Sequence, residues 1–319
     1  VKWTVGRAGM LYRDLLPGRA GGALIASHIC IPEGGDVPDY VHFHRVHFQL
    51  IVCLRGWVEV VYEGQGAPFM LRRGDFVTQP PTIRHRVLRS SDGLEVLEIG
   101  APALHATLAD HAHPLPMCSE KSEASDPSNQ LPADARFGGQ RFVHSRRKEA
   151  GAEAPTRLED GLEWRESEVY SATAGLARVR RAWRASRTAA KVDADSAANA
   201  GAKVSTETRG GLDGFAPPPE GSRAPGGVRD AGNRDLSSLG DAHVTIAFVM
   251  SGRATLSSLT ADNEMRLEDL GGADCATLPP GRPWRWLDPS DDFELIEVSF
   301  PKSEEERAAD VLSLFDLEP

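Results

Sequence analysis

Hydrophobic and polar positions in the first hundred residues alternate in short runs separated by turn residues. The run 22–31 ends at a proline and two glycines, and the run 57–62 ends at Glu63-Gly64. Period-two alternation bounded by such residues is typical of half-buried β-strands. Runs of the same kind cover residues 76–78, 83–88 and 94–99. No amphipathic helix pattern interrupts them, so this half of the chain predicts a β-sandwich or barrel.

The second half of the chain repeats the first. The segment 9–14 (GMLYRD) recurs as 161–166 (GLEWRE), and 94–99 (LEVLEI) recurs as 293–298 (FELIEV). The first match is offset by 152 residues and the second by 199, which predicts an insertion of 47 residues in the second copy. An internal repeat of this kind indicates that one structural unit occurs twice.

The repeat gives a domain plan. We expect a first unit at 1–110, a linker at 111–138 and a second unit at 139–301. An insertion at about 187–236 is rich in Ala, Gly, Ser, Asp and Pro, which predicts irregular structure. Residues 302–319 predict a short packing helix, because Ser303 starts a capping box and apolar residues follow at helical spacing.

Composition limits the class of function. Acidic residues outnumber basic ones by 46 to 36, giving a net charge of −10, which argues against a nucleic-acid-binding surface. The four cysteines are scattered without a CxxC pair, so a reducing cytoplasm fits better than a disulfide framework. No apolar run is long enough to span a bilayer. The composition therefore favours a cytoplasmic protein whose main function is not nucleic-acid binding.

A group of histidines carries the candidate chemistry. His42 and His44 are two residues apart, so on a strand both side chains leave the same face. Gln49 follows, and His85 comes after a proline-marked turn into another strand. Three imidazoles and an amide converging inside a barrel would bind a divalent metal ion, and the ligand set suits Fe, Ni, Cu, Zn or Mn alike.

These residues resemble the two motifs of the cupin superfamily. Gly35, His42, His44, Gln49 and Gly56 fall close to the first motif, with Gly35 one residue further upstream than the motif asks, and Gly74, Pro80 and His85 follow the second. The chain departs from the motifs at Gln49, where the family usually has glutamate, and at Thr82 and Arg89, which replace a glycine and an asparagine. The resemblance implies an all-β fold of two jelly-roll barrels in tandem, a bicupin, with metal ligands His42, His44, Gln49 and His85.

The second barrel is expected to have no metal ligands. Trp284 stands where the first copy has His85, and Thr245 stands where it has Gln49. The insertion replaces the segment that would carry the HxH pair. We expect this barrel to be structural, or to hold an apolar pocket with Trp284 and Trp286 at its mouth.

Several residues near the expected site have two interpretations. Gln49 either binds the metal, leaving its +2 charge uncancelled and favouring an anionic substrate, or turns away to a neighbouring side chain. His47 and Tyr40 are candidate catalytic residues, but His47 could lie near solvent at the strand end and Tyr40 could pack on the rim. His111 and His113 also have HxH spacing, yet the prolines beside them indicate a surface loop.

Two further groups complete the expectations. Arg178, Arg180 and Arg184 share one face of the strand 177–185, which predicts a solvated outer face, with an anion site as the alternative. Cys53 is expected to face the barrel core.

The resemblance implies a metal-dependent enzyme acting on a small oxygen-rich or phenolic molecule, with dioxygenase-type ring or C–C cleavage as the first hypothesis. A lyase or isomerase that uses the ion without O2 is the nearest alternative, and a non-catalytic bicupin that binds a small ligand is the next. The expected cofactor is one divalent ion (Fe, Ni, Mn or Zn), the expected partner is a small, possibly anionic substrate, and a homodimer is possible.

Overall fold

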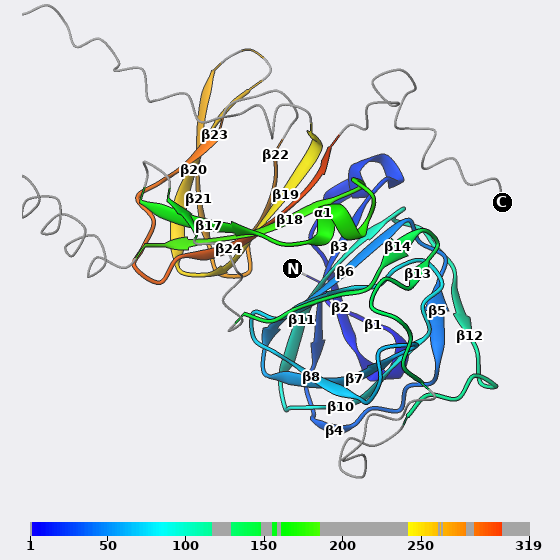
Figure 1. Ribbon diagram of the computed structural model, residues 1–319. Coiled ribbons are helices and arrows are strands. Elements are labelled where there is room, and N and C mark those ends of the chain that lie inside the picture. The colour runs from blue at the N-terminus through cyan, green and yellow to red at the C-terminus, as the bar shows by residue number, and fades with distance from the viewer. Residues whose placement is uncertain are drawn as a thin grey trace, which may run out of the picture.

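The computed structural model describes residues 2–116, 129–147, 155–157, 161–185, 242–260, 262, 264–278 and 284–301. The regular structure within these ranges is almost entirely β-strand, arranged as two barrels from successive halves of the chain (Figure 1). The helical elements in this part are short: η1 (Arg7–Gly9), η2 (Pro17–Gly22) and α1 (Val169–Ala172). The all-β prediction is confirmed. Across the described ranges, no helix has the length and apolar character needed to cross a membrane.

Two sheets form the first barrel. The larger sheet has seven strands in the order β1 (Thr4–Val5), β2 (Leu11–Asp14), β3 (Ile25–Ile31), β11 (Leu94–Ala101), β6 (Phe48–Arg55), β9 (Phe76–Thr78) and β15 (Val143–Ser145). The facing sheet has the order β12 (Thr107–Ala109), β5 (His42–His44), β10 (His85–Ser90), β7 (Trp57–Tyr62) and β8 (Phe69–Arg72), with β4 (Gly35–Asp36) paired to β10. A small hairpin, β13 (Arg136–Phe137) and β14 (Gln140–Arg141), lies beside them.

The second barrel repeats this strand order. Its larger sheet runs β16 (Thr156–Arg157), β17 (Leu162–Glu166), β18 (Arg178–Arg184), β24 (Glu294–Pro301), β19 (Ala242–Ser251) and β22 (Cys275–Leu278). Its smaller sheet runs β21 (Met265–Gly271), β20 (Arg253–Leu259) and β23 (Trp284–Leu287). The order β17-β18-β24-β19-β22 corresponds to β2-β3-β11-β6-β9 of the first barrel, so the repeat seen in the sequence is a repeat of structure.

Strand β6 contributes side chains to two cores, because its residues point alternately to its two faces. Phe48, Leu50 and Val52 point to one side and join an apolar core that also contains residues of the second barrel. Cys53 points to the other side, into the interior of its own barrel, as expected. The ring of Phe48 lies 5.3 Å from the ring of Phe300 in an edge-to-face contact. The two larger sheets therefore share one continuous core.

The boundary between the barrels lies later in the chain than the expected residue 139. Strand β15 pairs with β9, and the side chain of Asn129 bonds to the backbone of Tyr62, Gly64 and Gly66, all in the first barrel. Part of the expected linker 111–138 also belongs to this barrel, because Leu115 is buried against it and Gln130 forms a β-bridge with Gln65. The polar composition of 101–147 hid these contacts.

Large side chains fill the second barrel. Trp286 is 1% exposed and packs 5.4 Å from the ring of Phe293, and Trp284 is 9% exposed in the same core. The tryptophans thus lie in the core and not at the mouth of an apolar pocket, which favours the structural interpretation of this barrel. The insertion expected at 187–236 and the helix expected at 302–319 lie outside the described residues.

Candidate metal centre

The pairing of three strands brings the histidines of the first barrel together. His85, the first residue of β10, lies directly opposite His42 of β5 and also opposite Tyr62 of β7. His44 lies opposite Thr107 of β12. Because His42 and His44 have the same parity on β5, their side chains project to the same side, and His85 meets them there. The predicted three-histidine cluster forms through this register.

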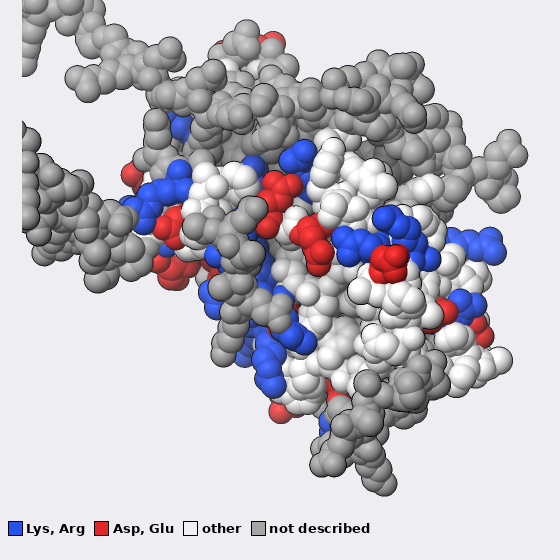
Figure 2. Space-filling view, viewed as in Figure 1, with Lys and Arg blue, Asp and Glu red and all other residues white. Residues whose placement is uncertain are grey.

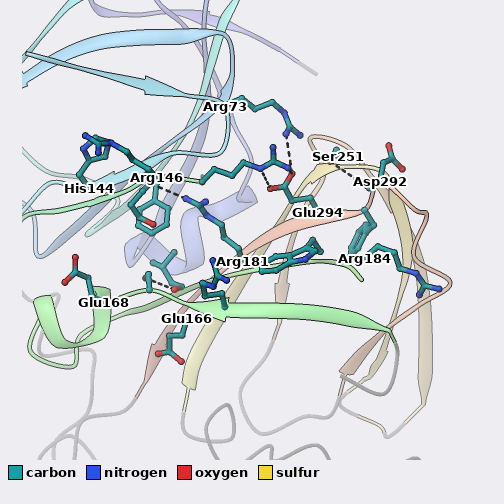
Figure 3. Close-up of a pocket in the computed structure, with 18 of the residues that line it drawn as sticks. Arg73, His144, Arg146, Glu166, Glu168, Arg181, Arg184, Ser251, Asp292 and Glu294 are labelled. Carbon is teal, nitrogen blue, oxygen red and sulfur yellow. Dashed lines mark hydrogen bonds and ion pairs between the residues drawn. The ribbon is translucent and has the colours of Figure 1, made fainter. Parts of the chain in front are cut away.

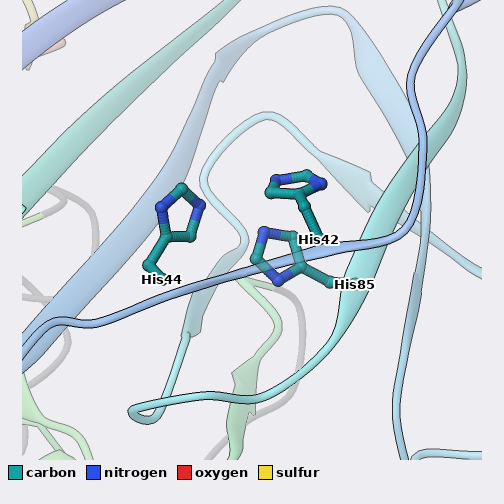
Figure 4. A group of neighbouring side chains, drawn as sticks. All are labelled: His42, His44 and His85. Atoms are coloured by element: carbon teal, nitrogen blue, oxygen red, sulfur yellow. The ribbon is translucent and has the colours of Figure 1, made fainter. Parts of the chain in front are cut away.

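The three imidazoles form a compact group (Figure 4). One ligand atom from each lies within 4.8 Å of the others, and the rings of His42 and His85 are 4.2 Å apart between centroids. Each Nδ1 already has a partner: the carbonyl oxygen of Tyr40 for His42 at 2.8 Å, the carbonyl oxygen of Ile83 for His85 at 3.0 Å, and the hydroxyl of Thr107 for His44 at 2.9 Å. A carbonyl oxygen accepts only from a protonated Nδ1, so the contact with Ile83 leaves Nε2 as the free ligand atom of His85. The Nδ1 of His42 also lies 3.0 Å from a guanidinium nitrogen of Arg7, and the Thr107 hydroxyl can donate to His44 or accept from it.

Burial keeps these imidazoles neutral. Desolvation, together with the neighbouring histidines, lowers the pKa of His44 to about 2 and the pKa of His85 well below its ordinary value. Desolvation and the Arg7 guanidinium also lower the pKa of His42. Neutral imidazole is the form that binds metal. The Nε2 atom of His42 is buried with no hydrogen-bond partner, an arrangement that costs free energy unless a ligand occupies the site.

Neighbouring side chains hold the cluster in place. Asp39 is buried beside His42, and its carboxylate accepts hydrogen bonds from Arg7 at 2.6 Å and from the backbone N–H of Val87 at 3.0 Å. The ring of the fully buried Tyr62 stacks on His85 with centroids 5.4 Å apart. These contacts restrict the rotation of two of the three rings.

A cavity of about 470 Å³ lies next to the cluster inside the first barrel, and His44 and His85 are among the residues that line it. Its wall is largely aliphatic, with Ile29, Ile51, Val60 and Leu71 among the lining side chains. An apolar cavity with a few polar groups is the usual form of a small-molecule site.

Gln49 lines this cavity, with one end of its amide bonded to a neighbouring side chain and the other end without a partner. Its Nε2 donates a hydrogen bond of 2.6 Å to the carboxylate of Glu98, so the side chain does bond to a neighbour. Its Oε1 is buried with no hydrogen-bond partner. Because the carboxylate fixes which end of the amide is the donor, the oxygen remains available as a neutral ligand.

Glu98 is the important residue that the sequence analysis missed. The replacement of glutamate at position 49 suggested that the site has no carboxylate, yet Glu98 lines the same cavity from β11. The signal was present in the alternation of β11, where Leu97 and Ile99 join the shared core and Glu98 has the opposite, inward parity. A charged residue at an inward position of a buried strand is a candidate functional group.

The other candidates take different positions. Tyr40 lines the cavity, and its ring lies 5.9 Å from that of His42. His47 is half-buried and is not among the residues that line the cavity. His105, which the sequence analysis did not single out, also lines the cavity, and its ring is 5.5 Å from that of His44. His111 is exposed in its loop, 5.2 Å from the ring of Tyr40.

The residues present fit a divalent metal ion. Three neutral imidazoles and an unpartnered amide oxygen are the donor types that such ions accept. Pairing of β19 with β24 puts Thr245 opposite Ser299, just as Gln49 lies opposite Gly100, which confirms that threonine replaces the glutamine. Within the described ranges, the three histidines are the one group of His, Cys, Asp or Glu residues arranged to hold a metal.

Comparison with known proteins agrees with this geometry. Residues 27–100 match the model of the Cupin domain family. No curated protein matches the chain. Solved structures of oxalate decarboxylase from Bacillus subtilis are similar over most of both chains. The structure at pH 4.6 has a TM-score of 0.53 and 11% identity and covers 97% of this chain and 78% of that one. A tryptophan-to-phenylalanine variant has a TM-score of 0.55 and 12% identity, with coverages of 99% and 82%. At this identity the similarity shows the fold.

Proposed function

We propose that this chain, in which residues 27–100 form a cupin domain within a bicupin fold, is a metal-dependent enzyme acting on a small oxygen-rich anion. The observation that carries the proposal is the set of three neutral imidazoles converging beside a largely apolar cavity that also holds Glu98. His42, His44 and His85 would hold the ion, with Gln49 as a fourth ligand. Manganese is a candidate alongside iron, nickel and zinc, since one of the similar structures is described by its Mn(II) centres.

The donor set favours an anionic substrate. Imidazole and amide ligands are neutral, so they cancel none of the ion's positive charge, and a bound carboxylate or enolate would. The ion, when bound, polarises substrate oxygens and lowers the pKa of a hydroxyl. The aliphatic wall excludes water from around the substrate, which strengthens these interactions.

Glu98 is the group in this cavity that would accept or return a proton. Its carboxylate is fixed by the 2.6 Å hydrogen bond from Gln49. Tyr40 and His105 would contact the substrate from the cavity wall. His47 stays a weaker catalytic candidate, since it does not line the cavity.

Two reaction types remain as proposals. Dioxygenase-type ring or C–C cleavage follows from the resemblance of the motifs, and O2 uptake on a substrate screen would support it. A lyase or decarboxylase reaction without O2 is favoured by Glu98, because such reactions need a group that handles a proton and need no oxidant. Turnover that continues under nitrogen would decide for the second. A cytoplasmic location and a homodimer belong to the same proposal.

The first experiment is elemental analysis of the purified protein and of two double variants. His42→Ala/His85→Ala should lose the metal, whereas His111→Ala/His113→Ala removes two histidines of equal spacing outside the cluster and should retain about one ion per chain. Glu98→Gln should keep the ion and lose turnover. Equal metal contents in both double variants would mean that the histidines are structural, and the protein would then be better described as a non-catalytic ligand binder.

A further inference from the structure

A second cavity, of about 730 Å³, lies where the two barrels meet. The first barrel contributes Arg73, Phe76 and the segment 144–147, and the second contributes parts of β17, β18 and the start of β24 (Figure 3). Arginine is the commonest residue type in its wall: Arg73, Arg146, Arg147, Arg165, Arg181 and Arg184. This cavity is separate from the histidine cluster, and the proposed function does not use it.

Most carboxylates of this cavity already have partners. Glu294 accepts two hydrogen bonds of 3.0 Å from Arg147 and one of 3.3 Å from Arg73, which links the two barrels. Glu166 pairs with Arg178 at 3.3 Å and Glu168 pairs with Arg141 at 3.5 Å. Asp291 and Asp292 are exposed.

The arginines expected to form a solvated face behave differently from one another. Arg178 pairs with Glu166, and Arg180 pairs with Glu297 and is only 15% exposed. Arg184 lines the cavity. Two other arginines differ from these. Arg181 lies between Arg180 and Arg184 on β18, and Arg165 lies opposite Arg181 on β17.

Arg165 and Arg181 face each other directly across the β17–β18 pair. Side chains at such opposed positions share one face of the sheet at close distance, and two like charges there are destabilising. Among the described residues, neither guanidinium has a carboxylate within 4.0 Å, and the Nε atom of each is buried with no hydrogen-bond partner. Arg181 makes one bond of 3.3 Å, to the carbonyl oxygen of Ser145.

Aromatic rings hold both guanidinium groups in place. Arg181 lies over the ring of Phe76 at 5.0 Å, and Arg165 lies 5.9 Å from the ring of Trp183. Stacking of this kind covers the flat face of a guanidinium and leaves its N–H edge available. Burial lowers the pKa of Arg181 to about 10; the carboxylates of Glu294 and Asp75 oppose this, and the charges of Arg147 and Arg165 add to it. Arg181 is therefore still charged at neutral pH.

We propose that this cavity binds the phosphate group of a small organic molecule between the guanidinium groups of Arg165 and Arg181. Two fixed positive charges with no carboxylate partner in the described part of the chain are matched by a phosphate monoester, which carries about −1.5 to −2 at neutral pH, whereas a carboxylate would leave one of them unmatched. Phe76, Val179, Trp183 and Phe293 give the cavity an apolar wall for the organic part. The attraction is local to the cavity, since positive and negative side chains are intermixed on the face shown in Figure 2.

The test uses two probes, inorganic phosphate and phenyl phosphate, titrated calorimetrically into the full chain at constant ionic strength, with acetate as the comparison anion. Phenyl phosphate should bind more tightly than inorganic phosphate, and acetate should not bind measurably. Arg165→Gln should weaken phosphate binding at least tenfold, and so should Arg181→Gln. Arg285→Gln removes the same charge from an exposed position of the second barrel and should change nothing.

Thermal unfolding of the protein in a chloride buffer, with and without added phosphate, separates a binding role of these arginines from a structural one. Arg165→Gln relieves the opposed charges, so its melting temperature without phosphate should equal or exceed that of the parent, while its stabilisation by phosphate is lost. An unchanged phosphate response in Arg165→Gln would overturn the proposal. It would equally be overturned if acetate stabilised the protein as well as phosphate, or if His42→Ala/His85→Ala abolished phosphate binding, because the anion would then be at the metal centre.

Discussion

Thr82 has a backbone φ of +67° on the turn that leads to His85. Glycine adopts this left-handed conformation without cost, whereas a β-branched residue is strained there by about 1–3 kcal/mol. Thr82 is exposed, and its backbone N–H donates to the carbonyl oxygen of His44 at 3.0 Å, a bond that glycine would keep. Thr82→Gly should therefore raise the free energy of unfolding by about 1 kcal/mol, measured by urea denaturation.

Thr277 provides the matched control. It is exposed on the regular strand β22, where glycine has only an entropic disadvantage. Thr277→Gly should lower the free energy of unfolding by about 0.5–1 kcal/mol. If both variants were destabilised alike, strain at Thr82 would not be the cause.

The buried histidines make the metal-free protein sensitive to acid. The pKa of His44 is lowered to about 2 by burial and by its histidine neighbours, while the unfolded chain protonates near the ordinary value of about 6.5. Below that pH the unfolded state binds more protons, so stability is complete above about pH 6.5 and is lost as the pH falls.

His44→Gln isolates this contribution. In chelator, the loss of stability between pH 6.5 and pH 5 should be smaller in the variant, by at most about 1.4 kcal/mol per pH unit. Urea titrations at three pH values give the slopes. Parallel slopes for the parent and the variant would show that His44 is free to protonate in the folded chain.

At the scale of single elements, the two tryptophans of strand β23 fill the core of the second barrel, which favours a structural role for this barrel. Trp284 and Trp286 point inward and Arg285 points to solvent. Trp286→Ala should cost about 3–5 kcal/mol of stability, because the surrounding core cannot close around so large a cavity. Metal content should not change, since the metal centre is in the other barrel. Arg285→Ala, on the opposite face, should change stability by less than about 0.5 kcal/mol.

The sequence predicted those strands in which hydrophobic and polar residues alternate and a turn residue follows. Strand β7 was found with its observed bounds, because alternation and a following turn mark it. Strands β12 and β15 were missed, since each has three residues and is held at a sheet edge by its partner more than by its own composition. His105 was missed with them, and it lines the cavity only because that segment folds back onto β5.

The histidine cluster was predictable because parity on one strand places His42 and His44 together. Glu98 was not singled out, because its role depends on which face of β11 meets the cavity, and that face is decided by the packing of Leu97 and Ile99 against the second barrel. The arginine cavity lies beyond sequence reasoning altogether, since it forms from both halves of the chain.

At the scale of the whole molecule, the shared core makes the two barrels one folding unit. Phe48, Leu50 and Ile99 of the first barrel are buried with Phe248, Ile296 and Phe300 of the second. Glu294 adds polar links to Arg147 and Arg73 across the junction. A domain whose exposed face is this apolar would be unstable alone, so we expect the barrels to unfold together.

Two cysteines, one buried and one half-buried, report on this coupling separately. Cys53 lies in the first barrel and Cys275 in the second, and burial raises the pKa of each thiol to about 12. Neither should react with a thiol reagent at pH 8 until its barrel unfolds. Pulse labelling along a urea series, followed by peptide mass spectrometry, should show both cysteines becoming reactive at the same urea concentration.

Phe300→Ala removes the ring packed on Phe48, costs about 3–5 kcal/mol, and should move the Cys275 transition to lower urea than that of Cys53. Separate transitions already present in the parent would show instead that each barrel is stable by itself, and that the shared core forms only after both have folded.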